Sequence, residues 1–202
     1  MALTTAESSA TTADYVWFYL AKVIIVTALL LGFRRPWKDI QPRARFLVPA
    51  VLVGLAVCVE WLVLDKLIPY PHLGHRTSLD PFTAIEAPAL RSLFLIARFY
   101  GLAVMVPIME ELFWRSFLLR YFSYPDDFTK LAVGKFSWRA FWMVAVCFGL
   151  VHSEWLVAVI CACAYALLLR QTRSLFACIV AHGTTNLALG LYIVLTHDWV
   201  YW

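Results

Sequence analysis

The sequence predicts an all-α fold, a polytopic membrane bundle of about six transmembrane helices, with a range of about six to eight. Three observations lead to this prediction. Of the 202 residues, 62% are hydrophobic and only 15% are charged, whereas soluble domains are roughly half apolar and a quarter charged. The surplus apolar surface needs a lipid environment, which admits only helices or closed barrels. The apolar runs are long and do not alternate with polar residues, so helices are favoured.

The first expected span covers residues 15–33 and follows a small, polar segment, residues 1–14. That segment lacks a basic region, and no Ala-x-Ala cleavage pattern follows the apolar run. We therefore expect a retained span rather than a cleaved signal. The second span covers residues 46–64. An irregular connection rich in Pro and Gly, residues 65–87, separates it from the third.

The third span is predicted to be a long tilted or broken helix over about residues 88–121. The fourth, residues 138–152, is short, and residues 153–155 separate it from a fifth that ends at Leu169. The sixth covers about residues 174–195. Each run is apolar enough for a helix in lipid, and about 20 apolar residues suffice to cross a bilayer.

Positive charge is concentrated in the odd-numbered connections, which predicts the orientation of the chain. The first connection holds Arg34, Arg35, Lys38, Arg43 and Arg45, the third holds Arg120, Lys130, Lys135 and Arg139, and the fifth holds Arg170 and Arg173. We expect these connections inside, with the N-terminus and the tail over residues 197–202 outside. The net charge of +4 is thus explained by membrane topology, and no nucleic-acid partner is expected.

Three of the spans contain polar residues, which cost at least a few kcal/mol each inside a bilayer unless they are paired or functional. Residues 109–115 read MEELFWR, residues 148–152 read FGLVH and residues 182–186 read HGTTN. Counted from the inner ends of their spans, Glu110, His152 and His182 lie about 14 to 20 Å deep at 1.5 Å per residue. We expect these three side chains to meet in the inner half of the membrane.

Helix geometry gives the two adjacent glutamates different roles. Glu111 and Arg115 are four residues apart and share a face, where they can form an ion pair. Glu110 is rotated by about 100° from Glu111, so its carboxylate remains available as a general base. His182 and Asn186 are also four apart, and both can donate hydrogen bonds to a developing oxyanion.

Each of these polar residues also has a structural interpretation. An isolated intramembrane His commonly serves as an interhelical hydrogen-bonding group, and we favour a structural role for the ion pair of Glu111 and Arg115. We also expect Glu60 to pair with Arg91 and Arg98. A proton-coupled transporter would use similar residues, but the sequence has no inverted repeat to support one.

Taken in order, Glu110-Glu111-x-x-x-Arg115, Phe148-x-x-x-His152 and His182-x-x-x-Asn186 resemble the three motifs of a known family. It is the CAAX-protease and bacteriocin-processing family of intramembrane endopeptidases, related to the Rce1-type prenyl-protein proteases. The resemblance covers about the last half of the chain. Residues 109–121 and 174–191 further resemble a bacterial subgroup found alongside exosortase systems, which implies the bacterial inner membrane.

The resemblance implies one integral membrane domain over residues 1–202, with a motif-bearing core at about residues 88–195 and an internal polar cavity. It implies cleavage near the C-terminus of a protein or peptide substrate, which can be lipidated. Glu110 would activate water with help from His152, and His182 and Asn186 would hold the oxyanion. The supporting residues would be Glu111, Arg115 and Phe148, and membrane lipids would be further partners.

Two alternatives stay open. Glu110, His152 and His182 form a ligand set that catalytic zinc uses, but the sequence lacks His-Glu-x-x-His, and a glutamate with two histidines can activate water unaided. We therefore favour hydrolysis without a cofactor, with zinc as the alternative. The second alternative is a non-catalytic membrane scaffold or immunity protein, since some members of the resembling family have such roles.

Overall fold

The computed structural model describes residues 12–74 and 78–202, and these residues form helices and loops without any strand. Five helical segments are long and apolar enough to cross a membrane: Asp14–Gly32, Ala44–Leu67, Pro88–Ser123, Trp155–Thr172 and Leu175–Thr196. A shorter apolar helix, Trp138–Leu150, lies between the third and fourth. The predicted all-α membrane bundle is therefore confirmed. Residues 1–11, on which part of the retained-span expectation depends, lie outside the described residues.

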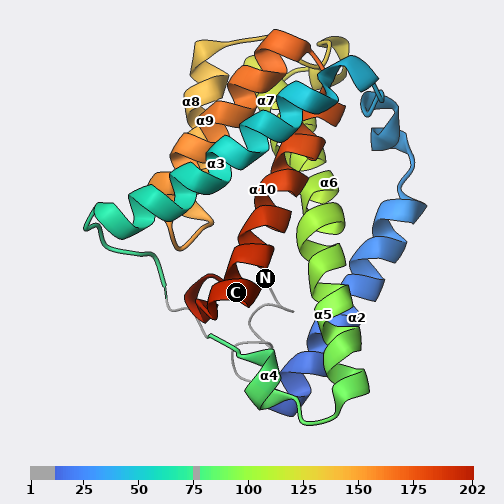
Figure 1. The fold of residues 1–202 in the computed structure, drawn as a ribbon. Helices are drawn as coiled ribbons and strands as arrows, with labels where there is room; N and C mark the ends of the chain where they lie inside the picture. Colours follow the sequence, from blue (N-terminus) through green and yellow to red (C-terminus); the bar gives the residue numbers. More distant parts are fainter. Residues whose placement is uncertain (1–11, 75–77) are drawn as a thin grey trace.

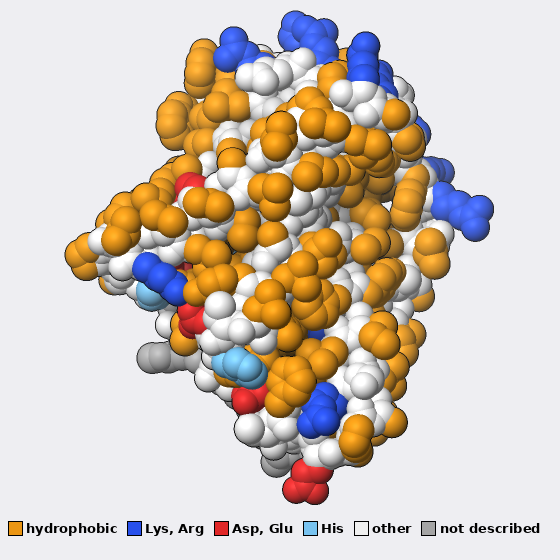
Figure 2. Space-filling model, viewed as in Figure 1, with side chains coloured by type: hydrophobic (Ala, Val, Ile, Leu, Met, Phe, Trp, Pro, Cys, Tyr) orange, Lys and Arg blue, Asp and Glu red, His pale blue; other side chains and the backbone are white. Residues whose placement is uncertain are grey.

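The first two spans are α2 (Thr12–Gly32) and α3 (Leu47–Leu67). Two 3-10 turns, η1 (Arg35–Asp39) and η2 (Ala44–Phe46), connect them. Outward-facing apolar side chains cover the spans, as lipid requires. Ile24, Val48 and Ile96 are each 69% exposed. Figure 2 shows this apolar surface, with Lys and Arg gathered at the end of the molecule where η1 lies.

The third span is one unbroken run of helix with two π-helical segments. It consists of α5 (Pro88–Tyr100), the π segment η3 (Gly101–Met105), α6 (Val106–Glu111), the π segment η4 (Leu112–Leu118) and α7 (Leu119–Ser123). Pro107 lies in the first turn of α6, just after η3. The wider turn of η3 accommodates this residue, which lacks an N–H donor. The two π segments flank Glu110 and Glu111, so they set the direction in which these carboxylates point.

Helix α10 (Leu175–Thr196) lies at the centre of the bundle, between α3 and the α5–α6 run (Figure 1). Glycines allow this close packing. A Cβ atom on Gly54 would collide with the Ala181 carbonyl and with Thr184, and one on Gly183 would lie 2.6 Å from the Ala103 carbonyl oxygen. The helix that carries the His182 motif is therefore held on both sides by backbone contacts.

Helices α8 (Trp138–Leu150) and α9 (Trp155–Thr172) form a hairpin, and the turn that joins them contains His152. Gly149 lets the hairpin close, because a Cβ there would lie 2.5 Å from Val159. The loop after α3 covers the turn: the Leu73 amide donates to the Ser153 carbonyl (2.9 Å), and the Trp155 indole donates to the Pro71 carbonyl (2.9 Å). The break predicted at residues 153–155 is a turn over residues 151–154, since α9 begins at Trp155.

Candidate active site

Glu110, His152, His182 and Asn186 line one central cavity of about 200 Å³. Glu110 comes from α6, His152 from the α8–α9 turn, and the other two from α10. The predicted convergence of these side chains is therefore present. Since a water molecule occupies about 30 Å³ in the liquid, the cavity has room for several waters or a short stretch of peptide.

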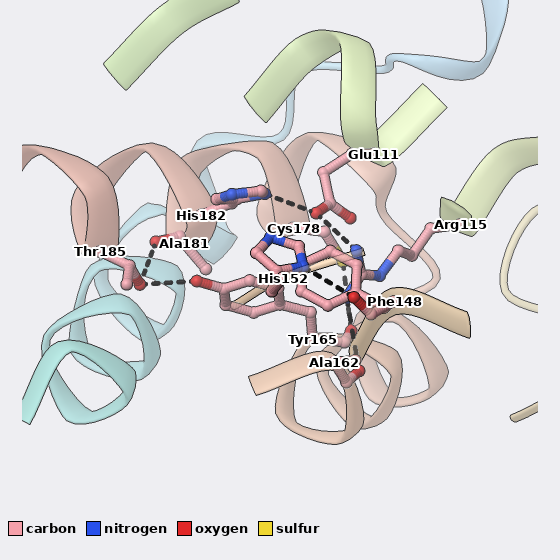
Figure 3. A network of polar contacts seen from close by, with 10 residues as sticks. All are labelled: Glu111, Arg115, Phe148, His152, Ala162, Tyr165, Cys178, Ala181, His182 and Thr185. Atoms are coloured by element: carbon pink, nitrogen blue, oxygen red, sulfur yellow. Dashed lines mark hydrogen bonds and ion pairs between the residues drawn. The ribbon is translucent and has the colours of Figure 1, made fainter. Parts of the chain in front are cut away.

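Glu111, Arg115 and His182 form a buried polar network (Figure 3). Arg115 Nη1 donates to Glu111 Oε1 at 3.0 Å, and both side chains are fully buried. The predicted ion pair is thus confirmed. The sequence did not indicate that the same oxygen also accepts from His182 Nδ1, at 2.9 Å. This contact leaves Nε2 of His182 as the ring nitrogen available to the cavity.

The His152 ring is oriented by the residue one turn before it. Its Nδ1 lies 2.7 Å from the Phe148 carbonyl oxygen, which can only accept, so Nδ1 carries the hydrogen. In the neutral ring, Nε2 is therefore a free acceptor. The Phe148 ring stacks on His152 with centroids 4.4 Å apart. These contacts give Phe148, which the sequence indicated as a supporting residue, a defined position beside the imidazole.

Tyr165 of α9 supports the second imidazole and was not identified from the sequence. Its ring stacks on His182 with centroids 5.3 Å apart, and the Arg115 guanidinium carbon lies 5.3 Å from the ring centroid of Tyr165. Its hydroxyl donates to Thr185 Oγ1 (2.6 Å), which in turn donates to the Gly54 carbonyl (2.8 Å). The only signal in the sequence was a polar hydroxyl in an apolar span.

Oε2 of Glu110 and Oε2 of Glu111 are both buried without a hydrogen-bond partner, but the other oxygen of Glu111 is paired with Arg115 and His182. Glu110 and His182 both interact electrostatically with the imidazole of His152. The cavity therefore contains one acid that the Arg115 pair does not neutralise. This matches the expectation from helix geometry that only one of the two adjacent carboxylates would be paired.

Asn186 is partly engaged with the backbone. Its Nδ2 donates to the Leu102 carbonyl at 2.9 Å, within the π segment η3. A side-chain amide has two N–H donors, so one remains for a ligand. The sequence indicated two free donors on this face of α10, one from Asn186 and one from His182.

The prediction that Glu60 pairs with Arg91 and Arg98 is wrong. Both Glu60 oxygens are buried without a partner. Arg91 donates to the Phe82 carbonyl (3.2 Å), and Arg98 donates to the Tyr15 hydroxyl (3.4 Å). The reason is the position of α10, which separates α3 from α5 (Figure 1), so residues at similar depth on these two spans do not meet.

Catalytic zinc is held by three protein side chains placed around one point. Across residues 12–74 and 78–202, no three side chains of His, Cys, Asp or Glu are placed to hold one metal ion. Glu110, His152 and His182 line the same cavity but, as they lie, do not form a zinc site. The expectation of hydrolysis without a cofactor stays a prediction.

Residues 92–188 match the family model described as "Type II CAAX prenyl endopeptidase Rce1-like". The matched segment contains all three motifs, from Glu110 to Asn186. No curated protein and no solved structure gives a match.

Proposed function

Since residues 92–188 belong to the Rce1-like family of type II CAAX prenyl endopeptidases, we propose that this integral membrane protein is an intramembrane endopeptidase. It hydrolyses a peptide bond near the C-terminus of a protein or peptide substrate. One observation carries the proposal: three separate parts of the fold bring an unneutralised carboxylate, two imidazoles and an amide to one cavity.

Glu110 and His152 activate the water. Both present acceptors, Oε2 of Glu110, which lacks a partner, and Nε2 of His152, whose Nδ1 is held by the Phe148 carbonyl. A water between them donates one hydrogen to each. As its oxygen attacks the substrate carbonyl, the Glu110 carboxylate takes the proton, and it returns this proton to the leaving amine when the C–N bond breaks.

His182 and Asn186 stabilise the oxyanion that forms on the substrate. As an imidazolium, His182 keeps its Nδ1–H on Glu111 and donates from Nε2–H into the cavity. The second N–H of Asn186 is the other donor. Removing a single donor of this kind typically lowers kcat by about 100- to 1,000-fold.

The cavity walls fit a substrate that arrives within the membrane. Besides the polar groups, the cavity is lined by apolar residues, among them Leu102, Val106, Leu189 and Ile193. A C-terminal segment with apolar side chains, or one carrying a lipid, suits such walls.

The test compares membrane proteomes of cells with the wild-type protein and with Glu110→Ala, using mass spectrometry of C-terminal peptides. We expect truncated C-termini only with the wild type, and the purified protein in proteoliposomes should reproduce the cleavage. Glu60→Gln is the matched control, since Glu60 is another carboxylate with buried, unpartnered oxygens outside the cavity. Identical products from wild type and Glu110→Ala would overturn the proposal.

The same experiment separates the scaffold alternative from catalysis. A scaffold would yield no product with either protein, and Glu110→Gln would lower partner retention and thermal stability together. A zinc-dependent version would require Glu110, His152 and His182 to move closer together. Full activity after chelation, with metal loss verified, would exclude it.

A further inference from the structure

A hollow of about 790 Å³ is separate from the central cavity. It lies between α2 and the α6–η4 run, on a different face of that run from Glu110. Its walls are mostly apolar, with Val26, Leu29 and Phe33 on one side and Met109, Phe113 and Phe117 on the other. We call it the tail groove.

A second, polar hollow of about 500 Å³ adjoins the tail groove. The two share Lys38, Asp39, Arg120 and Thr129 in their walls. The boundary between them is rigid, because Arg120 Nη2 lies 2.6 Å from Asp39 Oδ2 and Ser116 Oγ donates to the same oxygen at 2.6 Å. We call this second space the basic hollow.

Positive charge dominates the basic hollow. Its lining contains five basic side chains and one acidic one: Lys38, Arg43, Arg120, Lys130, Arg173 and Asp39. Asp39 neutralises Arg120, and Asp127 lies 3.5 Å from Lys130 in an exposed pair. Arg43 donates only to the neutral Gln41 side chain. The uncompensated charge is therefore positive, which suits an anionic group.

We propose that the tail groove and the basic hollow together bind one anionic phospholipid. Its acyl chains lie in the tail groove, whose walls belong to two membrane-spanning helices and so open to lipid. Its phosphate lies in the basic hollow, at the end of the molecule where Lys and Arg gather (Figure 2). Charge complementarity selects this occupant, because a zwitterionic lipid would leave the basic side chains without a net counter-charge.

The bound lipid would connect two parts of the fold that matter for the central cavity. It would contact η1 and α2 on one side and η4 on the other, and η4 begins directly after Glu111, which holds His182. The site therefore supports the third span from the face opposite α10. This inference does not depend on the proposed peptidase activity.

The test measures lipid binding to the full-length protein in neutral detergent, by native mass spectrometry and by thermal unfolding. The probes are phosphatidylglycerol and phosphatidylcholine with the same acyl chains. We expect one tightly held phosphatidylglycerol, which raises Tm more than phosphatidylcholine does. Lys38→Gln with Arg43→Gln should weaken phosphatidylglycerol binding about thirtyfold, the scale expected when two basic residues near an anionic lipid are lost.

The matched control is Arg34→Gln with Arg45→Gln. It removes two charges from the same connection, but neither residue lines either hollow, so phosphatidylglycerol affinity should be unchanged. Leu29→Trp, which fills the tail groove, should exclude the lipid while the basic hollow stays intact. The Tm of each variant, measured with phosphatidylcholine as the only lipid, checks that the variant is folded. Equal affinity for the two lipids, or equal losses in the two double variants, would overturn the proposal.

Discussion

Glu110 and Glu111 are neighbours in the sequence and have the same side chain, yet their surroundings are different. Glu111 is fully buried and accepts from both Arg115 and His182. Glu110 lines the cavity and forms no ion pair with a described residue. Removing the partner of a buried, paired carboxylate destabilises the fold. A buried carboxylate without an ion pair itself destabilises the fold, and a role in a functional site can explain why it is kept.

The two glutamates should therefore respond in opposite ways to the same substitution. Glu110→Gln removes the base and should abolish peptide hydrolysis, while Tm stays the same or rises. Glu111→Gln leaves Arg115 as a buried unpaired charge and should destabilise the fold by about 3 kcal/mol. Thermal unfolding in detergent and hydrolysis of an identified substrate measure both effects. A large loss of Tm for Glu110→Gln would contradict the assignment.

Tyr165 is a positioning residue for His182, and its hydroxyl and ring can be tested separately. Tyr165→Phe keeps the stacking on His182 but loses the hydrogen bond to Thr185, so we expect a modest loss in kcat. Tyr165→Leu also loses the stacking and should lower kcat much further at a similar KM. The pH profile of kcat is the diagnostic measurement, because only a positioning role shifts it. Equal profiles for wild type and Tyr165→Leu would indicate a packing role alone.

Sequence spacing predicted the residues of the site better than their partners. Intervals of four identified the faces on which Arg115 and Asn186 lie, because helix geometry is local. The contacts of His182 with Glu111 and of Asn186 with Leu102 join different spans, and their formation depends on how the helices pack. For the same reason the sequence placed Glu60 near Arg91 and Arg98 wrongly.

At the scale of elements, the spans followed closely from hydropathy, while the interruptions did not. The predicted sixth span, residues 174–195, corresponds to the helix Leu175–Thr196. The agreement is close because each apolar residue of a span is more stable in lipid than in water, and the backbone in lipid must be helical. The π segments η3 and η4 had no such signal. The wider turn of a π segment can expose a backbone carbonyl or redirect a side chain. In η3, the Leu102 carbonyl accepts a hydrogen bond from Asn186. Such contacts join different spans, so the sequence of one span does not predict them.

The α8–α9 turn should depend on the loop that covers it. Trp155→Phe removes the hydrogen bond to Pro71 (2.9 Å) and keeps most of the ring packing. We expect faster amide exchange over residues 151–155 and lower activity, because His152 is carried by this turn. Trp142→Phe is the control, since Trp142 is 55% exposed on the outer surface of α8. Unchanged exchange in Trp155→Phe would show that the loop does not restrain the turn.

At the scale of the whole molecule, the basic residues are distributed unevenly between the two ends of the helices. Of the 17 Lys and Arg residues, 11 lie in the connections after α2, α7 and α9 or within three residues of them, and Figure 2 shows Lys and Arg gathered at one end. Cytoplasmic connections are enriched in these residues. Side chains from α6, α10 and the α8–α9 turn line the central cavity, which lies between the two ends.

This charge asymmetry leads to a prediction about orientation that single cysteines can test. Glu86→Cys and Asp126→Cys replace exposed acidic residues at the two ends of the Pro88–Ser123 helix. In intact cells, a membrane-impermeant maleimide should label the first and should label the second only after permeabilisation. Each is compared with unsubstituted protein to correct for Cys58, Cys147, Cys161, Cys163 and Cys178, which lie inside helices. Labelling of Asp126→Cys in intact cells would reverse the orientation and place the basic hollow on the outer side.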